Sequence, residues 1–240
     1  MDNIGYTSLT RQSGLMREMQ SIANNIANAS TTGFRREGVI FSEYIHALEQ
    51  DDPSLSMATA NTRALNLEQG ALTQTGGTFD FAIEGDGFFL LDGPTGQFLT
   101  RAGVFTPSAE GELVTPDGYR LLDGGGSPIF IPPDAKAVSM AADGTLSADG
   151  RALALIGLFT PVDQTDLQHR DGVRFEAPGG VEPALTEATI LQGFVEGSNV
   201  DPIAEIARMI EVQRSYELGQ KFMEKEDERI RSVTKTVIGQ

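Results

Sequence analysis

Residues 21–36 read SIANNIANASTTGFRR, and this stretch decides the fold class. The apolar residues that lead into it and run through it alternate in spacing between four and three positions, which is the pattern of a coiled-coil seam. They are Leu15, Met19, Ile22, Ile26 and Ala29. The pattern predicts an N-terminal helix that stops near Gly33, because glycine adopts the left-handed cap conformation without penalty.

A second seam with the same alternating spacing lies near the C-terminus, with Gly219 and Glu226 as its two flaws. It consists of Met209, Val212, Tyr216, Gly219, Met223, Glu226, Ile230, Val233 and Val237. Upstream of it, Ser198 and Asp201 have the spacing of a capping box, and Pro202 suits a first helical turn. The sequence predicts a long helix over residues 200–237.

Glycine and proline concentrate between these two helices. Of the 27 Gly, 21 lie in residues 70–197, and nine of the 11 Pro lie in residues 94–183. Short apolar runs such as FDFAIEG and GFFLLD alternate there with DG, PTG and PDG turns, which is typical of antiparallel strands. Because one seam cannot bury itself, the two helices are natural partners. We predict an α+β fold: long N- and C-terminal helices paired as a coiled coil, with an inserted antiparallel β domain of short strands.

Four segments follow from this pattern. Residues 1–37 form an N-terminal helical arm, 38–75 an extended linker, 76–195 an acidic β domain and 196–240 a C-terminal coiled-coil helix. Within the linker, VIFSEYIHALEQ fits either a strand or a short helix, and DDPSLSMATANTR fits an extended polar segment.

Charge is distributed unevenly over a chain whose net charge is −16. Residues 1–37 hold four basic and three acidic side chains, 38–190 hold seven and 22, and 191–240 hold seven and nine. An acidic middle opposes nucleic-acid binding, which needs phosphate neutralisation. Nearly neutral ends are typical of segments that face protein.

The sequence offers no constellation for catalysis and no cofactor site. There is no Cys, and His46 and His169 lie far apart, so we expect surface histidines and no metal site. Two acidic pairs fit solvated turn carboxylates better than an acid–base site. They are Glu84 with Asp86, and Glu110 with Glu112.

Three amides, Asn24, Asn25 and Asn28, lie beside the N-terminal seam at helical spacing. Asparagine is a poor residue for a helix interior, so its presence needs a reason. A polar residue at a helix interface costs stability and fixes register and partner. We interpret the amides as interface residues; the alternative is an exposed polar face.

Several motifs, in order along the chain, resemble those of the bacterial flagellar axial proteins, which include rod, hook and hook-associated proteins. ANNIANASTTGFRRE resembles the N-terminal signature of this family, and EGSNVDPIAEIARMIEVQRSYE resembles the C-terminal one. IEGDGFFLL, FLTRAGVFTPSAEGELVTPDGYRLL and LQGFVEGSNV resemble the middle domain of rod and hook members. The length of the chain favours a rod member. Its first 20 residues and its last 20 or so look more like a proximal than a distal rod subunit.

The resemblance implies a structural subunit that polymerises with other proximal and distal rod subunits. It implies passage through the flagellar type III export apparatus without a cleaved signal peptide, assembly in the periplasm, and possible neighbours among the basal-body rings. It implies neither nucleic-acid binding nor membrane insertion, and MDNIGYTSLTRQ lacks the apolar core of a signal peptide. Two rivals remain: a β-domain enzyme and a cytoplasmic coiled-coil adaptor that forms a closed oligomer.

The expected subunit interface combines both seams, the amides and the residues that flank the helices. Its candidates are Leu15, Met19, Ile22, Asn24, Asn25, Ile26, Asn28, Thr31, Thr32, Gly33, Phe34, Ser198, Asn199, Val200, Met209, Val212, Gln213, Arg214, Tyr216 and Met223. For Gln213 and Arg214 a solvated polar face is the alternative, and Ser198 is otherwise only a helix cap. We expect the two arms to be poorly ordered in the free monomer.

Overall fold

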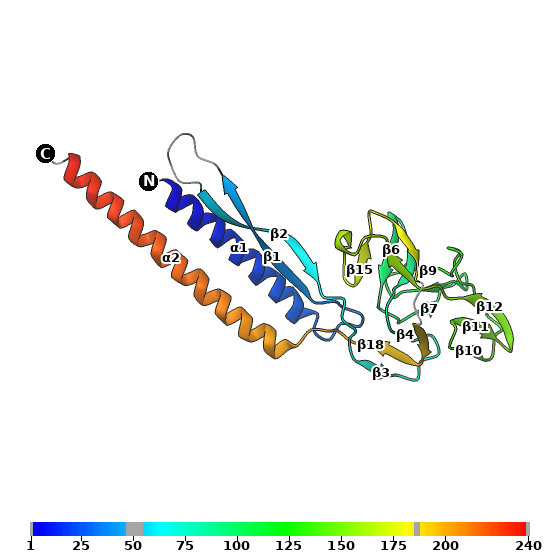
Figure 1. Cartoon of the computed structure of the whole chain (residues 1–240). Coiled ribbons are helices and arrows are strands. Elements are labelled where there is room, and N and C mark those ends of the chain that lie inside the picture. Colours follow the sequence, from blue (N-terminus) through cyan, green and yellow to red (C-terminus); the bar gives the residue numbers. More distant parts are fainter. Residues whose placement is uncertain (1, 47–54, 185–187, 239–240) are drawn as a thin grey trace. The chain divides into compact units, whose positions relative to one another are not determined.

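The computed structural model describes residues 2–46, 55–184 and 188–238. Contacts divide the described chain into two compact units. The helical unit contains residues 2–27, 36–46, 55–66 and 201–238; the β unit contains residues 28–35, 67–184 and 188–200. The mixed fold with helices towards both ends and antiparallel strands between them is confirmed (Figure 1).

Two helices and one hairpin build the helical unit. Helix α1 spans Asp2–Ala27 and helix α2 spans Pro202–Ile238, and they run antiparallel side by side (Figure 1). Strands β1 (Glu37–His46) and β2 (Leu55–Leu65) pair antiparallel, with a register shift after Ile40. Helix α1 contacts α2 on one side and the hairpin on another. In the described residues, no helix combines the length and apolarity that crossing a membrane requires.

The hairpin differs from the expected linker. For VIFSEYIHALEQ the sequence fitted either a strand or a short helix. The structure forms residues 39–46 of it as part of the strand β1, and residues 47–50 lie outside the described residues. The extended segment that follows becomes its partner β2, except for residues 51–54, which lie outside the described residues. The physical reason is pairing: two extended segments leave their backbone groups without partners until they lie beside each other.

Helix α2 begins at Pro202, two residues after the predicted start, and its cap differs from the prediction. The Asp201 carboxylate accepts hydrogen bonds from the backbone N–H groups of Ile203 at 3.0 Å and Ala204 at 3.3 Å, so Asp201 is the N-cap. The Ser198 hydroxyl instead accepts from the Val200 N–H at 3.2 Å, before the helix starts. The capping box predicted for Ser198 is therefore wrong by three residues.

The end of the C-terminal seam is uncovered. Helix α2 has 37 residues and α1 has 26, so α1 is too short to cover all of it. Ile230 is 45 % exposed and Val233 is 50 % exposed. The spacing identifies both residues as seam positions, yet the described part of the chain leaves them open.

One antiparallel sheet of seven strands forms the largest element of the β unit. Its strand order is β14-β15-β6-β5-β9-β8-β7. The strands are β5 (Phe89–Gly93), β6 (Gly96–Thr100), β7 (Thr106–Pro107), β8 (Leu113–Val114), β9 (Arg120–Leu121), β14 (Gln168–His169) and β15 (Arg174–Glu176).

Smaller antiparallel sheets complete the unit: β10-β11-β12, β13-β16, β17-β4 and β18-β3. Their strands are β3 (Leu72–Gln74), β4 (Phe81–Glu84), β10 (Val138–Met140), β11 (Thr145–Ala148), β12 (Arg151–Leu155), β13 (Phe159–Pro161), β16 (Val181–Pro183), β17 (Thr189–Gln192) and β18 (Phe194–Glu196). A short 3-10 helix covers Gln164–Asp166.

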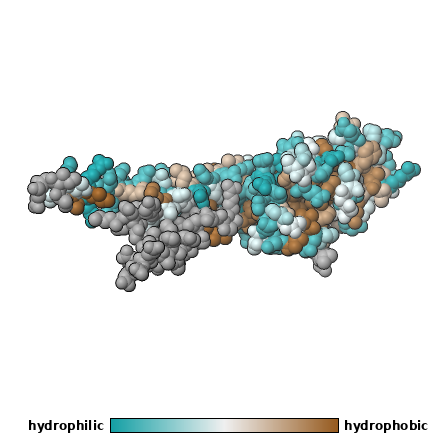
Figure 2. Space-filling view, turned by 90° about the horizontal axis from the view of Figure 1, so that it is seen from above, coloured by the Kyte–Doolittle hydropathy of each residue, from teal (hydrophilic) through white to brown (hydrophobic). Residues whose placement is uncertain are grey.

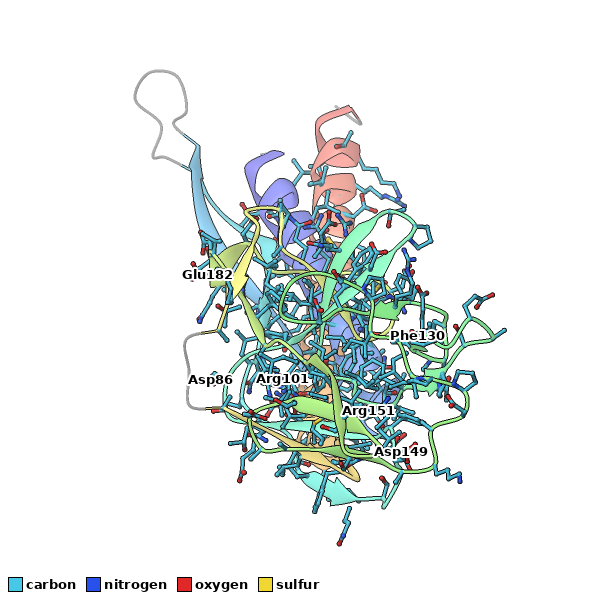
Figure 3. All side chains as sticks on the ribbon, turned by 90° about the vertical axis from the view of Figure 1, so that its right-hand side faces the viewer. Asp86, Arg101, Phe130, Asp149, Arg151 and Glu182 are labelled. Atoms are coloured by element: carbon cyan, nitrogen blue, oxygen red, sulfur yellow. The ribbon has the colours of Figure 1, made fainter. Side chains whose placement is uncertain are left out.

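The β unit holds the larger hydrophobic core. Alternate residues of β4 and β5 enter this core, and the residues between them are buried as well, so both faces of these strands are covered. The buried members are Phe81, Ile83, Phe89, Leu91, Phe98, Phe105, Leu113, Leu121, Ile129, Ile131, Leu146, Ile156 and Ile190. At the edge of the unit, Phe130 and the β11–β12 turn at Asp149 lie away from this core (Figure 3).

Candidate interaction site

The two predicted seams meet in the helical unit. Leu15 and Ile22 of α1 and Val212 of α2 are buried together. Their partly buried neighbours in the same cluster are Met19, Ile26, Met209 and Tyr216. All seven are candidates from the sequence, and the structure brings them together within one chain.

A glycine flaw in the second seam has a structural reason. The Gln12 side chain crosses from α1 and donates from Nε2 to the Tyr216 carbonyl oxygen at 2.9 Å. A Cβ placed on Gly219 would lie only 2.0 Å from that Nε2 atom. Gly219 thus leaves room for a polar side chain that crosses between the helices, and the sequence analysis overlooked Gln12.

Asn25 is the centre of a buried junction. Its side chain is fully buried, and its Oδ1 accepts from the Glu37 N–H at 2.9 Å while Nδ2 donates to the Glu37 carbonyl at 2.8 Å. The same Nδ2 donates to the Glu205 carboxylate of α2 at 3.1 Å. One amide therefore joins α1, the start of β1 and the first turn of α2.

Neighbouring side chains complete this junction. The Ser21 hydroxyl donates to the Glu37 carbonyl at 3.1 Å, and Arg36 Nε donates to Glu205 at 2.5 Å. Buried charges are stable when they are paired and hydrogen-bonded, which is the state of Glu205. Asn25 thus has a role inside the chain that the sequence analysis did not anticipate, and its expected role between subunits stays a prediction.

A second buried polar cluster centres on Glu196 in the β unit. Its carboxylate accepts from Arg35 at 2.5 Å, from Arg101 at 3.2 Å and from the Gly70 N–H at 2.8 Å. All three charged side chains are almost completely buried. Burial lowers the pKa of Arg101, the Glu196 carboxylate opposes that shift, and the positive charge of Arg35 adds to it.

The Glu196 cluster joins segments that are far apart in the sequence. Arg35 lies within the N-terminal signature, Arg101 follows β6 and Glu196 ends β18. Arg101 also donates to the Gly85 carbonyl oxygen at 2.8 Å. The negative charge of Asp86 raises the pKa of Arg101 and so opposes the effect of burial (Figure 3). The cluster therefore joins the segment that carries Arg35 and the end of β18 to the end of β6.

The turn after α1 is seated tightly in the β unit. Gly33 has φ +72°, and a Cβ there would lie 2.2 Å from the Ala102 backbone nitrogen. The Gly33 N–H donates to the Glu196 carbonyl at 2.7 Å. Only glycine combines that conformation with so close an approach. Phe34 is fully buried next to it, with its ring edge-on to His169 at 5.8 Å between centroids.

The other predicted flanking residues lie near this turn. The Thr31 hydroxyl donates to the Asn28 side-chain oxygen at 3.1 Å, and Thr32 is half-buried. Asn199 donates from its backbone to the Phe34 carbonyl at 3.4 Å and from its side chain to the Glu68 carbonyl at 2.8 Å. Ser198 is half-buried, and Val200 is 8 % exposed.

The remaining candidates lie on the surface of the helices. Gln213 and Arg214 are exposed, and Gln213 reaches Glu217 on the same helix at 3.3 Å. Asn24 and Met223 are half-buried. A neighbouring subunit can reach these side chains without unfolding the chain that carries them.

The residues considered for chemistry do not form a site. Glu84 and Asp86 are exposed, and Glu110 and Glu112 border a turn held by the Ser108 hydroxyl. The side chain of His46 lies outside the described residues. His169 is half-buried in β14 against Phe34 and Phe175 rather than on a solvated loop. Among the described residues, no three acidic or histidine side chains gather as metal ligands would.

Comparison with known proteins accounts for this architecture. The chain is 40% identical over 238 residues to the flagellar basal-body rod protein FlgF of Caulobacter vibrioides, which covers 97% of this chain and 96% of the relative. The chain belongs to the flagellar basal-body rod protein family. Another rod-family relative, FlgF of Mesorhizobium japonicum, is 38% identical, with 88% of each chain covered. FlgG of Bacillus subtilis is 29% identical, with 93% of this chain and 94% of the relative covered.

Family models match both ends and the middle of this rod-family chain. Residues 6–35 match the flagella basal body rod protein model, which covers most of α1 and the Gly33 turn. Residues 82–148 match the flagellar hook protein FlgE/F/G D1 domain, and 191–236 match the flagellar basal body rod FlgEFG protein C-terminal model. The two terminal matches contain the helix cluster, the Asn25 side chain and the Glu196 cluster's Arg35 and Glu196.

Proposed function

We propose that this rod-family chain is a structural subunit of the flagellar basal-body rod and polymerises through its terminal helices. The observation that carries the proposal is the helical unit: α1 and α2 pair through a small cluster, yet they leave large apolar side chains open. Exposed examples are Leu9 at 57 %, Ile203 at 81 % and Leu218 at 67 %. Large uncovered apolar surface marks a site of protein contact.

The pairing of α1 and α2 favours a coiled-coil arrangement. Both seams alternate three- and four-residue spacings, and their facing residues form one buried cluster. The twenty interface candidates divide accordingly. Buried ones such as Phe34 and Asn25 shape the chain itself, and the accessible ones, Asn24, Gln213, Arg214 and Met223, are those we assign to contacts with neighbouring subunits.

We assign the chain to the proximal rod, as an FlgF-like subunit, and its partners to other proximal and distal rod subunits. Two relatives named FlgF, which match 88–97% of this chain at 38–40% identity, support this over the distal, FlgG-like alternative, whose relative in Bacillus subtilis is 29% identical. Rod membership further supports export through the flagellar type III apparatus without a cleaved signal peptide, a periplasmic location, and neighbours among the basal-body rings. A structural family favours a non-catalytic role.

Electron microscopy of basal bodies from cells that lack this gene tests the proposal. We expect rings with an incomplete rod and no hook, and the length of the rod stub distinguishes a proximal from a distal subunit. Complete hooks and filaments would contradict an essential rod role. A stable closed oligomer found only in the cytoplasm would favour the adaptor alternative.

The amides near the end of α1 provide a finer test. Asn24→Leu and Asn28→Leu are expected to leave the β unit folded and to impair assembly, because both replace a register-setting amide by an apolar group. Swimming assays and basal-body yields measure the effect. Normal motility in both variants would remove the amides from the interface.

A further inference from the structure

The first turns of α1 border a groove on the side of α2. The hydrophobic cluster between the two helices covers α1 from Leu15 to Ile26. From Leu15 towards Thr7, a groove of about 440 Å³ lies between α1 and α2, and Leu218 and Phe222 of α2 are among the residues that line it. These two side chains are 67 % and 48 % exposed, and Figure 2 shows hydrophobic residues among hydrophilic ones on the helices. Apolar packing against α2 therefore holds this part of α1 less firmly than the part that follows Leu15.

Gln12 crosses the groove, and Gly219 gives it room. Gln12 is 7 % exposed, and its Nε2 donates to the Tyr216 carbonyl oxygen at 2.9 Å. A carbonyl oxygen has two lone pairs, so it accepts this bond in addition to the one within its own helix. A helical side chain lies beside the carbonyls three and four residues before it, and a Cβ at position 219 would be 2.0 Å from Nε2. Gly219 is the single glycine of α2, so the helix has this opening at one place.

Stability alone does not explain a glutamine at position 12. Its Oε1 is buried and accepts no hydrogen bond from the described residues. A buried oxygen without a donor costs free energy, which an apolar side chain of similar length would avoid. A hydrogen bond through a single opening, in contrast, is directional and limits how far α1 slides along α2. A slide by one turn, about 5.4 Å, would bring the amide against a residue that carries a side chain.

We propose that Gln12 is a positioning residue for rod assembly: through the opening at Gly219, it holds the first turns of α1 at one position on α2. Leu9, which is 57 % exposed and three residues before Gln12, takes its place on the surface from this position. The inference rests on the proposed rod function, because a filament repeats one contact from copy to copy and needs the same surface on each.

Distances between two spin labels test the position directly, since the natural chain has no Cys that would also be labelled. The labels are attached to full-length Ser13→Cys/Lys225→Cys, because both residues are exposed, one on α1 and one on α2. We expect a single narrow distance distribution, which Gln12→Met makes at least twice as wide. Gln20→Met, at an exposed amide of α1, is the matched control and should leave the width unchanged. An unchanged width in Gln12→Met overturns the proposal, and so does a broad distribution before any change at Gln12.

A double-mutant cycle tests the role of Gly219. Alanine is the better helix former, so in a Gln12→Ala background Gly219→Ala should lower the opening equilibrium of α1, measured by native-state hydrogen exchange, about fivefold. With Gln12 present, the new methyl group takes the place of the amide and removes its hydrogen bond, so the opening equilibrium should not fall. The same fivefold fall in both backgrounds would show that Gly219 does not serve Gln12, and would overturn the proposal.

Basal-body yields separate positioning from stability, and this inference from the proposed function. Gln12→Met is expected to lower the yield several-fold while the opening equilibrium of α1 stays within about threefold of its natural value, because the buried unpaired oxygen is removed together with the hydrogen bond. A normal yield overturns the positioning role alone, and so does a fall in yield with an equal rise in opening. Complete rods in cells that lack the gene contradict the proposed function instead.

Discussion

The buried amide of Asn25 leads to a quantitative prediction for Asn25→Ala. The change removes a hydrogen bond from the Glu37 N–H at 2.9 Å and two donated by the amide, at 2.8 Å and 3.1 Å. The Glu37 carbonyl keeps the Ser21 hydroxyl as a donor, and the Glu205 carboxylate keeps Arg36. The buried Glu37 N–H, in contrast, loses the acceptor that Asn25 supplies.

The magnitude follows from these contacts. An unsatisfied buried N–H costs about 1–3 kcal/mol, and each lost hydrogen bond whose acceptor keeps a partner costs about 0.5–1.5 kcal/mol. Alanine is the better helix former, by at most about 0.7 kcal/mol. The net loss is about 1.3–6 kcal/mol, which corresponds to a rise of about 8-fold to about 20,000-fold in the opening equilibrium of the helical unit.

Native-state hydrogen exchange of the α1 amides measures this opening directly, since local unfolding is reported segment by segment. Gln20→Ala is the matched control, because Gln20 is an exposed amide on the same helix. We expect the control to change the opening free energy by no more than about 0.5 kcal/mol. Equal effects of the two substitutions would refute the junction as a stabilising element, and faster exchange in β5 and β6 would refute its confinement to the helical unit.

Three further predictions concern the two units. Gly33→Ala is expected to lower Tm more than Gly76→Ala does. Both glycines have positive φ, but only at Gly33 would a Cβ clash, with the backbone of Ala102. Similar Tm values for the two variants would contradict the close approach of Gly33 to Ala102. Glu196→Gln should destabilise the β unit by about 3–5 kcal/mol in urea unfolding, because it leaves the buried guanidinium groups of Arg35 and Arg101 without a carboxylate. Glu176→Gln, which removes an exposed ion pair with Arg170, should change the free energy of unfolding by less than about 1 kcal/mol. Limited proteolysis should digest α1, the hairpin and α2 and leave about residues 67–200, because the helical unit has only a small core; a fully resistant monomer would contradict this.

The helices were predictable because their signal is local. Alternating spacing identified the residues of the inter-helix cluster, and Pro202 marked the start of α2. The capping residue was misplaced at Ser198 because Ser and Asp both accept from backbone N–H groups, and spacing alone does not choose between them. The open end of the seam at Ile230 and Val233 could not be predicted, because the periodicity does not reveal where the shorter partner helix ends.

The polar junctions were beyond sequence reasoning. Arg35 and Glu196 are 161 positions apart, and Asn25 and Glu205 are 180 apart, so no local pattern pairs them. A buried charge looks like a solvated one in the sequence, because only the fold brings its partner near. The unusual amides in ANNIAN indicated an interface between subunits, which stays a prediction, and the structure gives Asn25 partners inside the chain. The β1–β2 hairpin stayed undecided for the same reason, since pairing decides between strand and helix.

The central claim is that this chain is a rod subunit whose helical units contact one another. A high-resolution cryo-electron microscopy map of the rod in native basal bodies tests it most directly. The account predicts density for this chain in the rod, with α1 and α2 of neighbouring subunits in contact. A rod without this chain, or one in which its helical units touch no other subunit, would contradict the account.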